Sequence, residues 1–342
     1  MSTYRAPRGM QDWTPDDQRY YRWIERVAVE IASRYGHLPI ATPIVEHTEV
    51  FERGVGTGTD IVEKEMYSFE TQGNEQLTIR PEFTAGIMRA YVENGMHNLP
   101  QPVKLYAFGQ VLRYERPGMG RYRQHTQFSV EAVGEQDPAL DAELMNLVAD
   151  IFAVLGIGEI SFLINSIGCP TCRPPYISDV LVPWLEARRD RLGETDRMRL
   201  EKNPLRVLDS KDPDVQAMAE EAPLLESHLC DECRAHFAAV RHYLDLLGYR
   251  YEIDPRLVRG LDYYTKTVFE AKSDALDTSN NTLCAGGRYD GLVELLGGSP
   301  APAIGFGLGY ERVRLVLEEL GIEPPSLPQI QLYAVWFDPA TK

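Results

Sequence analysis

Two runs of strand-forming residues joined by a short turn constrain the fold of this chain more than any other part of its sequence. The first run extends from Val103 to Tyr114, a turn follows at residues 117–120, and a second run extends from Gln127 to Val133. Apolar and aromatic runs separated by a turn containing proline and glycine are typical of a β-hairpin. The sequence therefore predicts a long antiparallel hairpin over residues 103–133.

Helices are expected before and after this hairpin. Thr14-Pro15 combines a cap residue with a proline at the first helical position, apolar residues follow at helical spacing, and Gly36 ends the helix. Asp137-Pro138 opens a second helix that closes at Gly156, and a third is expected from about Tyr310 to Leu320. Further strands are predicted at Gln76–Ile79, Ile160–Ile164, Thr267–Ala271 and Ala303–Gly309.

The character of the sequence changes twice along the chain. From about residue 168 to 248 it is charged and helix-forming, which indicates a helical domain inserted into a core. Prolines at 324, 325 and 328 are typical of a linker, and Ile330 to Phe337 then begins an apolar strand. We therefore expect a core in two parts (1–167 and 249–322), a helical insertion (168–248), and a linker with the start of a truncated domain (323–342).

Charge and composition exclude several classes of protein. The 342 residues include 35 Lys+Arg and 51 Asp+Glu, and the net charge of −16 argues against non-specific binding to nucleic acid or anionic membranes. A local basic site remains compatible with this charge. No apolar run reaches the roughly 18 residues of a membrane helix, and the first residues lack a signal-peptide core. We expect a cytoplasmic protein that does not enter a membrane.

Five cysteines in a chain without an export signal argue against a disulfide framework. Four of them form two Cys-x-x-Cys pairs, Cys169 with Cys172 and Cys230 with Cys233, a pattern that matches structural zinc sites. The pairs are far apart in the sequence, so the inserted domain would have to bring them together. Buried reduced thiols are the alternative interpretation, and Cys284 is expected to be a small core residue.

Basic residues gather on the predicted hairpin of this acidic chain. Between residues 104 and 123 the hairpin carries Lys104, Arg113, Arg116, Arg121 and Arg123 against the single acid Glu115. A planar guanidinium suits phosphate oxygens, so this cluster predicts a site for a triphosphate, with a solvated charged hairpin as the alternative. Two glycine patterns, at 54–58 and 305–309, lack the residues of a nucleotide loop and are interpreted as a flexible loop and a tightly packed strand.

Six segments carry a family pattern and occur in the family's order. They are Arg80-Pro-Glu-Phe-Thr84, Phe108 to Glu115, Arg121-Tyr-Arg-Gln124, Leu257 to Tyr264, Ala285 to Gly291 and Gly305 to Arg312. On these segments the chain resembles the histidyl-tRNA synthetases, which are class II aminoacyl-tRNA synthetases, from about Pro7 to Arg312. The resemblance implies an α+β fold, in which helices flank an antiparallel sheet, with a helical insertion domain and with a homodimer interface around Pro43.

The resemblance also implies an ATP site. Its residues would be Arg113, Glu115, Arg121, His125 and Arg312, with Mg²⁺ accompanying the nucleotide. Arg113 and Arg259 would approach the α-phosphate from opposite sides and stabilise the negative charge that develops when a carboxylate attacks it. Where His125 stands, relatives usually carry a phenylalanine that stacks on adenine. A flat imidazole can still stack, so we expect modestly altered ATP binding.

For the amino acid, the resemblance implies one set of residues near the α-amino group and another around the side chain. The first set is Glu82, Thr84 and Gln127, and the second is Glu131, Tyr264 and Tyr289, with Arg259 close to both. A neutral imidazole has one N–H donor and one acceptor nitrogen, so a carboxylate and a phenol can satisfy both. Without the matched context, the two tyrosines are more typical of core aromatics.

The resemblance implies a histidine–tRNA ligase, which joins histidine to ATP and then transfers it to the 3′ end of tRNA(His). A C-terminal anticodon-binding domain is also implied, of which residues 330–337 would supply only the first strand. The alternative is a non-catalytic paralogue that serves as regulatory subunit of ATP phosphoribosyltransferase. The arginines at 113, 121, 259 and 312 favour the enzyme. A third possibility, a pseudo-synthetase domain that senses uncharged tRNA, would normally lie beside other domains, and nothing in this chain suggests such domains.

Overall fold

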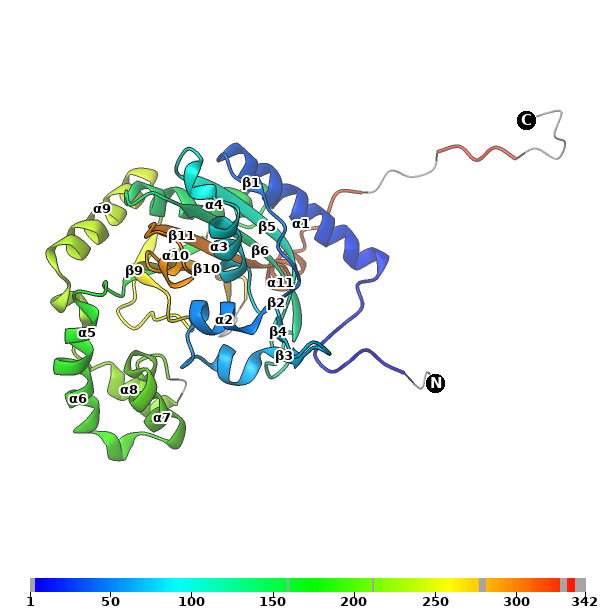
Figure 1. The fold of residues 1–342 in the computed structure, drawn as a ribbon. Coiled ribbons are helices and arrows are strands. Elements are labelled where there is room, and N and C mark those ends of the chain that lie inside the picture. The colour runs from blue at the N-terminus through cyan, green and yellow to red at the C-terminus, as the bar shows by residue number, and fades with distance from the viewer. Residues whose placement is uncertain (1–3, 159, 211, 277–280, 327–330, 336–342) are drawn as a thin grey trace.

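A computed structural model describes residues 4–158, 160–210, 212–276, 281–326 and 331–335 (Figure 1). Its centre is an eight-stranded sheet in which neighbouring strands are antiparallel except at the two edges. In spatial order the strands are β1 (Leu38–Pro39), β5 (Val103–Leu112), β6 (Gln124–Val133), β11 (Ala303–Gly309), β10 (Thr282–Arg288), β9 (Thr265–Ser273), β7 (Ile160–Ser166) and β8 (Tyr251–Ile253). The expected α+β fold with a largely antiparallel sheet is confirmed.

The predicted hairpin is formed by β5 and β6, which pair from Val103 with Val133 to Leu112 with Gln124. β5 ends one residue before Arg113, although the Arg113 N–H still donates to the Arg123 carbonyl at 2.8 Å. The turn is closed by a bridge between Gly118 and Arg121.

One face of the sheet is covered by four helices whose apolar residues form a single core with the strands. These helices are α1 (Pro15–Arg34), α4 (Ala139–Val154), α9 (Asp231–Leu247) and α11 (Tyr310–Glu319). Thr14 and Asp17 cap α1 reciprocally, as a capping box does. The Asp137 carboxylate accepts the Ala139 N–H at 2.8 Å and so holds the start of α4. The three predicted helices are confirmed within one or two residues at each end.

The opposite face of the sheet carries shorter elements. They are a three-stranded sheet of β2 (Val45–His47), β4 (Gln76–Ile79) and β3 (Tyr67–Glu70), and the helices α2 (Thr48–Val55), α3 (Thr84–Glu93) and α10 (Leu292–Leu295). The segment between β7 and β8 contains α5 (Arg173–Tyr176), α6 (Val182–Glu186), α7 (Glu194–Lys202), α8 (Pro213–Ala219) and α9. In Figure 1, α5 to α8 extend from one side of the molecule, whereas α9 lies against the sheet.

The described residues between 168 and 248 contain no strand, as expected for a helical insertion. The expected strand at 330–337 falls mostly outside the described residues, and the five described there, 331–335, are exposed and belong to no strand. Within the described ranges, no helix has both the length and the apolar character to cross a lipid bilayer.

Candidate active site

A cavity of about 860 Å³ lies on the face of the sheet that the four long helices leave free. Eleven of the twelve residues that the resemblance assigned to ATP and histidine line this cavity: Glu82, Thr84, Arg113, Glu115, Arg121, His125, Gln127, Arg259, Tyr264, Tyr289 and Arg312. The twelfth, Glu131, bonds directly to two of them, Thr84 and Tyr289. Residues that are far apart in the sequence are therefore gathered at one site.

Strand alternation explains why β6 can serve both the core and the cavity. Phe128, Val130 and Ala132 belong to the helix-covered core, whereas Gln127 lines the cavity and Ser129 and Glu131 share its polar network. Successive side chains of a strand point to opposite faces, so a single strand supplies both sets.

The glycines of β11 make room for these polar groups. Gly305 pairs with Glu131 and Gly307 with Ser129 across the β6–β11 ladder. A Cβ at Gly305 would overlap the Glu131 carboxylate and lie 2.6 Å from the Tyr289 hydroxyl, and one at Gly307 would lie 2.7 Å from Gln127 Nε2. The glycine pattern at 305–309 is thus a tightly packed strand, as predicted, and it also forms one wall of the site.

Glu131 is the centre of a buried polar network. Its carboxylate accepts hydrogen bonds from Thr84 Oγ1 at 2.8 Å, from Ser129 Oγ at 2.9 Å and from the Tyr289 hydroxyl. Glu131 is fully buried, and this burial raises its pKa to about 8. At pH 7 this group is therefore mostly protonated, and an N–H donor that enters the cavity would favour its ionised form, which accepts hydrogen bonds.

Glu82 lies at the start of α3, where backbone N–H groups are not yet used by the helix. Its two oxygens accept the N–H groups of Thr84 at 2.6 Å and Ala85 at 2.8 Å. Burial raises the pKa of Glu82, while these N–H groups and the Thr84 side chain oppose that rise. The residue is therefore a fixed acidic group in the cavity wall.

Three tyrosines form a packed wall of the cavity. Ring centroids lie 4.7 Å apart for Tyr263 and Tyr264, and 5.4 Å apart for Tyr263 and Tyr289. All three are buried, and burial raises the pKa of Tyr264 to about 12, so its hydroxyl stays protonated. Sequence reasoning did not single out Tyr263, although it directly precedes Tyr264.

Arginines and acids line the cavity around the tip of the hairpin. Arg113 Nε donates to the Pro81 carbonyl at 2.8 Å, and Arg121 Nε lies 3.0 Å from Glu115 Oε2. Arg312 donates to the carbonyls of Gly120 and Thr282, at 3.3 and 2.8 Å. Two carbonyl-bonded guanidinium groups and one paired with a carboxylate therefore surround one space, a distribution suited to a polyanion.

His125 lies in the same part of the cavity. Burial, with Arg113 nearby, lowers the pKa of His125 to about 3. The ring is therefore neutral at pH 7, as a surface for stacking requires. Lys104, by contrast, is remote from this cluster, because its Nζ donates to the Tyr35 carbonyl at 3.2 Å and pairs with Glu143. The prediction that Lys104 contributes to the anion site is wrong, since it lies at the opposite end of β5.

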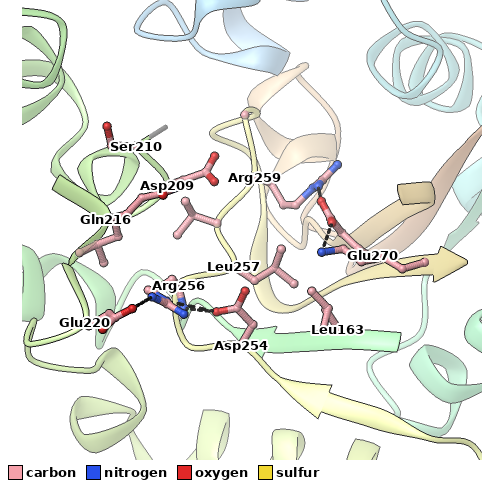
Figure 2. A pocket seen from close by; sticks show the side chains of 14 residues that line it. Leu163, Asp209, Ser210, Gln216, Glu220, Asp254, Arg256, Leu257, Arg259 and Glu270 are labelled. Carbon is pink, nitrogen blue, oxygen red and sulfur yellow. Dashed lines mark hydrogen bonds and ion pairs between the residues drawn. The ribbon is translucent and has the colours of Figure 1, made fainter. Parts of the chain in front are cut away.

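Arg259 lies where the main cavity meets an adjoining hollow of about 460 Å³ (Figure 2). Its Nη1 pairs with Glu270, whose other oxygen accepts the Thr282 hydroxyl at 2.9 Å. Arg259 Nε is buried and has no hydrogen-bond partner among the described residues. Because an unpaired buried donor is costly, this N–H is available for a ligand acceptor.

Two acids beside Arg259 were missed by sequence reasoning. Glu270 lies on β9, and Asp209 comes from the insertion and lines both cavities. Burial raises the pKa of Asp209, and the Arg259 charge opposes that rise. A glutamate within the apolar run Thr267–Ala271 was the available signal for Glu270. Asp209 lies on the helical insertion, where local sequence gives no indication that it faces the core.

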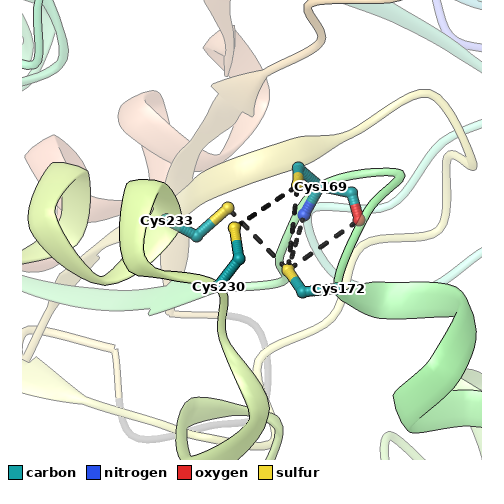
Figure 3. Close-up of side chains that lie close together, drawn as sticks. All are labelled: Cys169, Cys172, Cys230 and Cys233. Carbon is teal, nitrogen blue, oxygen red and sulfur yellow. Dashed lines mark hydrogen bonds between the residues drawn. The ribbon is translucent and has the colours of Figure 1, made fainter.

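The four paired cysteines come together at a second location (Figure 3). Cys169 and Cys172 follow β7, Cys230 caps α9, and Cys233 lies in its first turn. All four sulfur atoms lie within 4.8 Å of one another, and three of the Sγ–Sγ distances are 3.8 Å. Cys284 is buried in the main core and also borders the active-site cavity.

Comparisons with known proteins agree with this arrangement. The histidyl-tRNA synthetase family model matches residues 9–169 and 190–313. The histidine–tRNA ligase of Halothermothrix orenii is 47% identical over 331 residues, which are 97% of this chain and 78% of that protein. The crystal structure of the apo S. aureus histidyl-tRNA synthetase gives a TM-score of 0.77 at 39% identity, over 94% of this chain and 75% of that one.

A likeness of fold alone extends to the crystal structure of an ATP phosphoribosyltransferase regulatory subunit/histidyl-tRNA synthetase from Bacillus halodurans. It gives a TM-score of 0.68 at 23% identity, over 94% of this chain and 84% of that one. The identity of this chain to the histidine–tRNA ligases is much higher, which favours a ligase over a regulatory subunit. Because the family model covers most of the chain and the H. orenii ligase is nearly half identical to it, the chain belongs to the histidyl-tRNA synthetase family.

Proposed function

We propose that this chain is an ATP-dependent histidine–tRNA ligase that forms histidyl-adenylate and then transfers histidine to the 3′ end of tRNA(His). The observation that supports this proposal best is the shared cavity, where fixed arginines adjoin the buried Glu131–Tyr289 pair. The first group suits a triphosphate and the second an imidazole. Relatives that are 44–47% identical over most of the chain are histidine–tRNA ligases.

In this proposal Arg113 and Arg259 bind the α-phosphate and are the catalytic residues. The attacking carboxylate of histidine adds negative charge to the phosphate, and guanidinium groups fixed in advance stabilise this charge most in the transition state. Arg121 and Arg312 bind the outer phosphates, Glu115 the adenine, and His125 stacks on its ring. Mg²⁺ would enter with ATP, with Glu115 and Glu270 as carboxylates of the cavity that could help to hold it, and would supply positive charge that stabilises the departing pyrophosphate.

We propose that Glu82, Thr84 and Gln127 hold the α-amino group of histidine. Glu131 accepts one imidazole N–H, and the hydroxyl of Tyr264 donates to the other ring nitrogen, while Tyr289 donates its O–H to Glu131. A substrate that lacks either nitrogen would leave these buried groups unpaired. The pocket would therefore discriminate strongly between histidine and amino acids of similar shape.

The regulatory-subunit alternative predicts histidine binding without adenylation. The two are separated by the role proposed for Arg259, because stabilising charge on the α-phosphate is needed for adenylation and not for histidine binding alone.

The decisive experiment is histidine-dependent exchange of pyrophosphate into ATP. We expect exchange by the unaltered chain and a loss of about 10²-fold or more in Arg259→Ala, the range for removing a group that stabilises transition-state charge. Arg34→Ala is the matched control, since Arg34 is an exposed arginine on α1 paired with Glu30, and it should exchange normally. A folded protein that binds histidine but exchanges no pyrophosphate would support the regulatory alternative.

We further propose a cytoplasmic homodimer. Its interface would be the outer face of the small sheet, where Val45 and Phe69 are 37% and 43% exposed. On the inner face Glu46 pairs with Arg89, and Thr78 is fully buried. A sheet with its polar residues inside and apolar residues outside is best explained by a second copy on the outer face.

For the four clustered cysteines we propose one structural zinc ion. Zinc–thiolate bonds of about 2.3 Å in a tetrahedron require sulfur atoms about 3.8 Å apart. That is the distance for three of the sulfur pairs. The Thr171 N–H also donates to Cys169 Sγ at 3.4 Å, as expected for a thiolate held in a knuckle. Metal analysis of protein purified without chelator should give one zinc per chain, and its absence would end this proposal.

A further inference from the structure

The cysteine cluster lies directly behind the tyrosine wall of the active-site cavity. The chain that leads from β7 to Cys169 pairs with the start of β9, because Ile167 N–H donates to the Lys266 carbonyl at 2.8 Å and Lys266 N–H to the Gly168 carbonyl at 2.7 Å. Lys266 follows Tyr264 by two residues. Each Cys-x-x-Cys pair also has its own link to the residues of that wall.

The first link is made by Arg173, which directly follows Cys172 and begins α5. Its Nη1 donates to the Tyr264 carbonyl at 2.6 Å. Because a charged donor gives a strong hydrogen bond, the position of the first cysteine pair fixes the backbone that carries Tyr264.

The second link passes through Lys266, which is 7% exposed. Its Nζ lies 2.9 Å from Glu232 Oε1 and 3.2 Å from Asp290 Oδ2. Glu232 lies between Cys230 and Cys233, and Asp290 follows Tyr289. The second cysteine pair is therefore tied to the other tyrosine of the wall by a buried cation.

Lys266 is also held in an unfavourable backbone conformation. Its φ is +49°, in the left-handed region that residues other than glycine rarely adopt. Such a conformation persists only where surrounding contacts determine it. Here those contacts are the two backbone bonds to residues 167 and 168 and the two carboxylates at its Nζ.

We infer that metal bound by the four cysteines positions Tyr264 and Tyr289, and thereby sets the affinity of the site for histidine. This inference rests on the proposed function, because it takes the tyrosine wall to be part of a histidine pocket. The ion joins the segment after β7 to the start of α9, and without it only side-chain contacts would hold the two cysteine pairs at this spacing. Among the described contacts, none links the cysteine cluster to the residues at the tip of the hairpin. We therefore expect the affinity for ATP to be independent of the metal.

The first test compares the zinc-loaded protein with the same protein after removal of zinc by a chelator. We expect the Kd for histidine, measured by calorimetry, to rise about tenfold on zinc removal and to recover on zinc addition, a typical coupling between two sites. The Kd for ATP should stay the same. Zinc-free protein that remains folded and binds histidine with an unchanged Kd would overturn the inference.

The second test leaves all four cysteines intact, so that the protein keeps its metal. Glu232→Gln removes the charge that Lys266 contacts, and we expect a histidine KM about fivefold to tenfold higher in pyrophosphate exchange, with zinc content, ATP KM and kcat unchanged. Asp231→Asn is the matched control, because Asp231 precedes Glu232 in the first turn of α9, its side chain is 98% exposed, and its ion pair among the described residues is with Arg234.

The two variants and the metal analysis separate this inference from the proposed function. Equal histidine KM values in Glu232→Gln and Asp231→Asn would overturn the coupling while leaving the ligase intact. Zinc-loaded protein that binds no histidine would overturn the proposed function, and the inference with it.

Discussion

At the scale of single residues, the site depends on the missing Cβ of Gly305. Gly305 faces Glu131 across the β6–β11 ladder, and no side chain fits between them. Because Glu131 is fully buried, it cannot turn aside into solvent to make room. The wall of the pocket is therefore built from a backbone on one side and a carboxylate on the other.

We predict that Gly305→Ala damages histidine recognition more than ATP binding. The added methyl group would lie 2.6 Å from the Tyr289 hydroxyl and 2.5 Å from the Val130 carbonyl, which must move. Overpacking of this kind costs about 1–3 kcal/mol of unfolding free energy. Urea unfolding should show this loss, and pyrophosphate exchange should show a raised histidine KM with little change in the ATP KM.

Gly291→Ala is the control for this change. A Cβ at Gly291 would meet nothing within 4 Å, and its backbone does not need glycine. Its stability should change by less than about 0.5 kcal/mol. If both substitutions changed the unfolding free energy and the histidine KM equally, crowding at Gly305 would not be the cause of the loss.

At the scale of elements, a buried ion pair joins β10 to α4. Arg288 Nε contacts Asp141 Oδ2 at 2.7 Å, and both side chains are fully buried. The guanidinium also donates to the carbonyls of Glu135 and Asp137, at 3.0 and 2.9 Å. Arg288 thus fixes the end of β10, directly before Tyr289, against the start of α4.

We predict that Arg288→Leu lowers the free energy of unfolding by about 3–5 kcal/mol, because it removes the arginine from the buried Asp141 side chain and leaves it only the contact with His236 at 3.1 Å among the described side chains. Arg34→Leu, which breaks an exposed pair on α1, should cost less than about 1 kcal/mol. Denaturant titration of both variants measures the difference. The double variant Arg288→Leu/Asp141→Leu should recover much of the loss, and a failure to recover would indicate that the carbonyl contacts of Arg288 dominate.

The elements were predictable from sequence where local chemistry defines them. Thr14-Pro15 marks the start of α1, and the predicted strand run Ala303–Gly309 has the observed bounds of β11. The partners of those elements were not predictable. Arg288 meets Asp141 across 147 positions, and the edge strand β8 has only three residues, so neither leaves a local pattern. The site residues came from a family resemblance, and acids such as Asp209, which the insertion contributes, were missed.

At the scale of the whole molecule, the small sheet is the surface that the proposed dimer would use. Val45, Ile79 and Tyr67 are aligned across its three strands, as are His47, Leu77 and Phe69, so these side chains share one face. Burial of such a face against its symmetry mate removes apolar area from water on both copies at once. The interface would also adjoin α3, because Arg89 of that helix pairs with Glu46 on the inner face of β2.

We predict that the unaltered chain is a dimer in sedimentation equilibrium and that Val45→Asp weakens the dimer. A charge buried without a partner at the centre of an interface should raise the dimer Kd at least about 30-fold, corresponding to about 2 kcal/mol. Leu246→Asp is the control, since Leu246 is 70% exposed on α9 and far from the small sheet. Far-UV circular dichroism should show that both variants keep the fold. A Val45→Asp protein that dimerises as well as Leu246→Asp would place the interface elsewhere on the molecule.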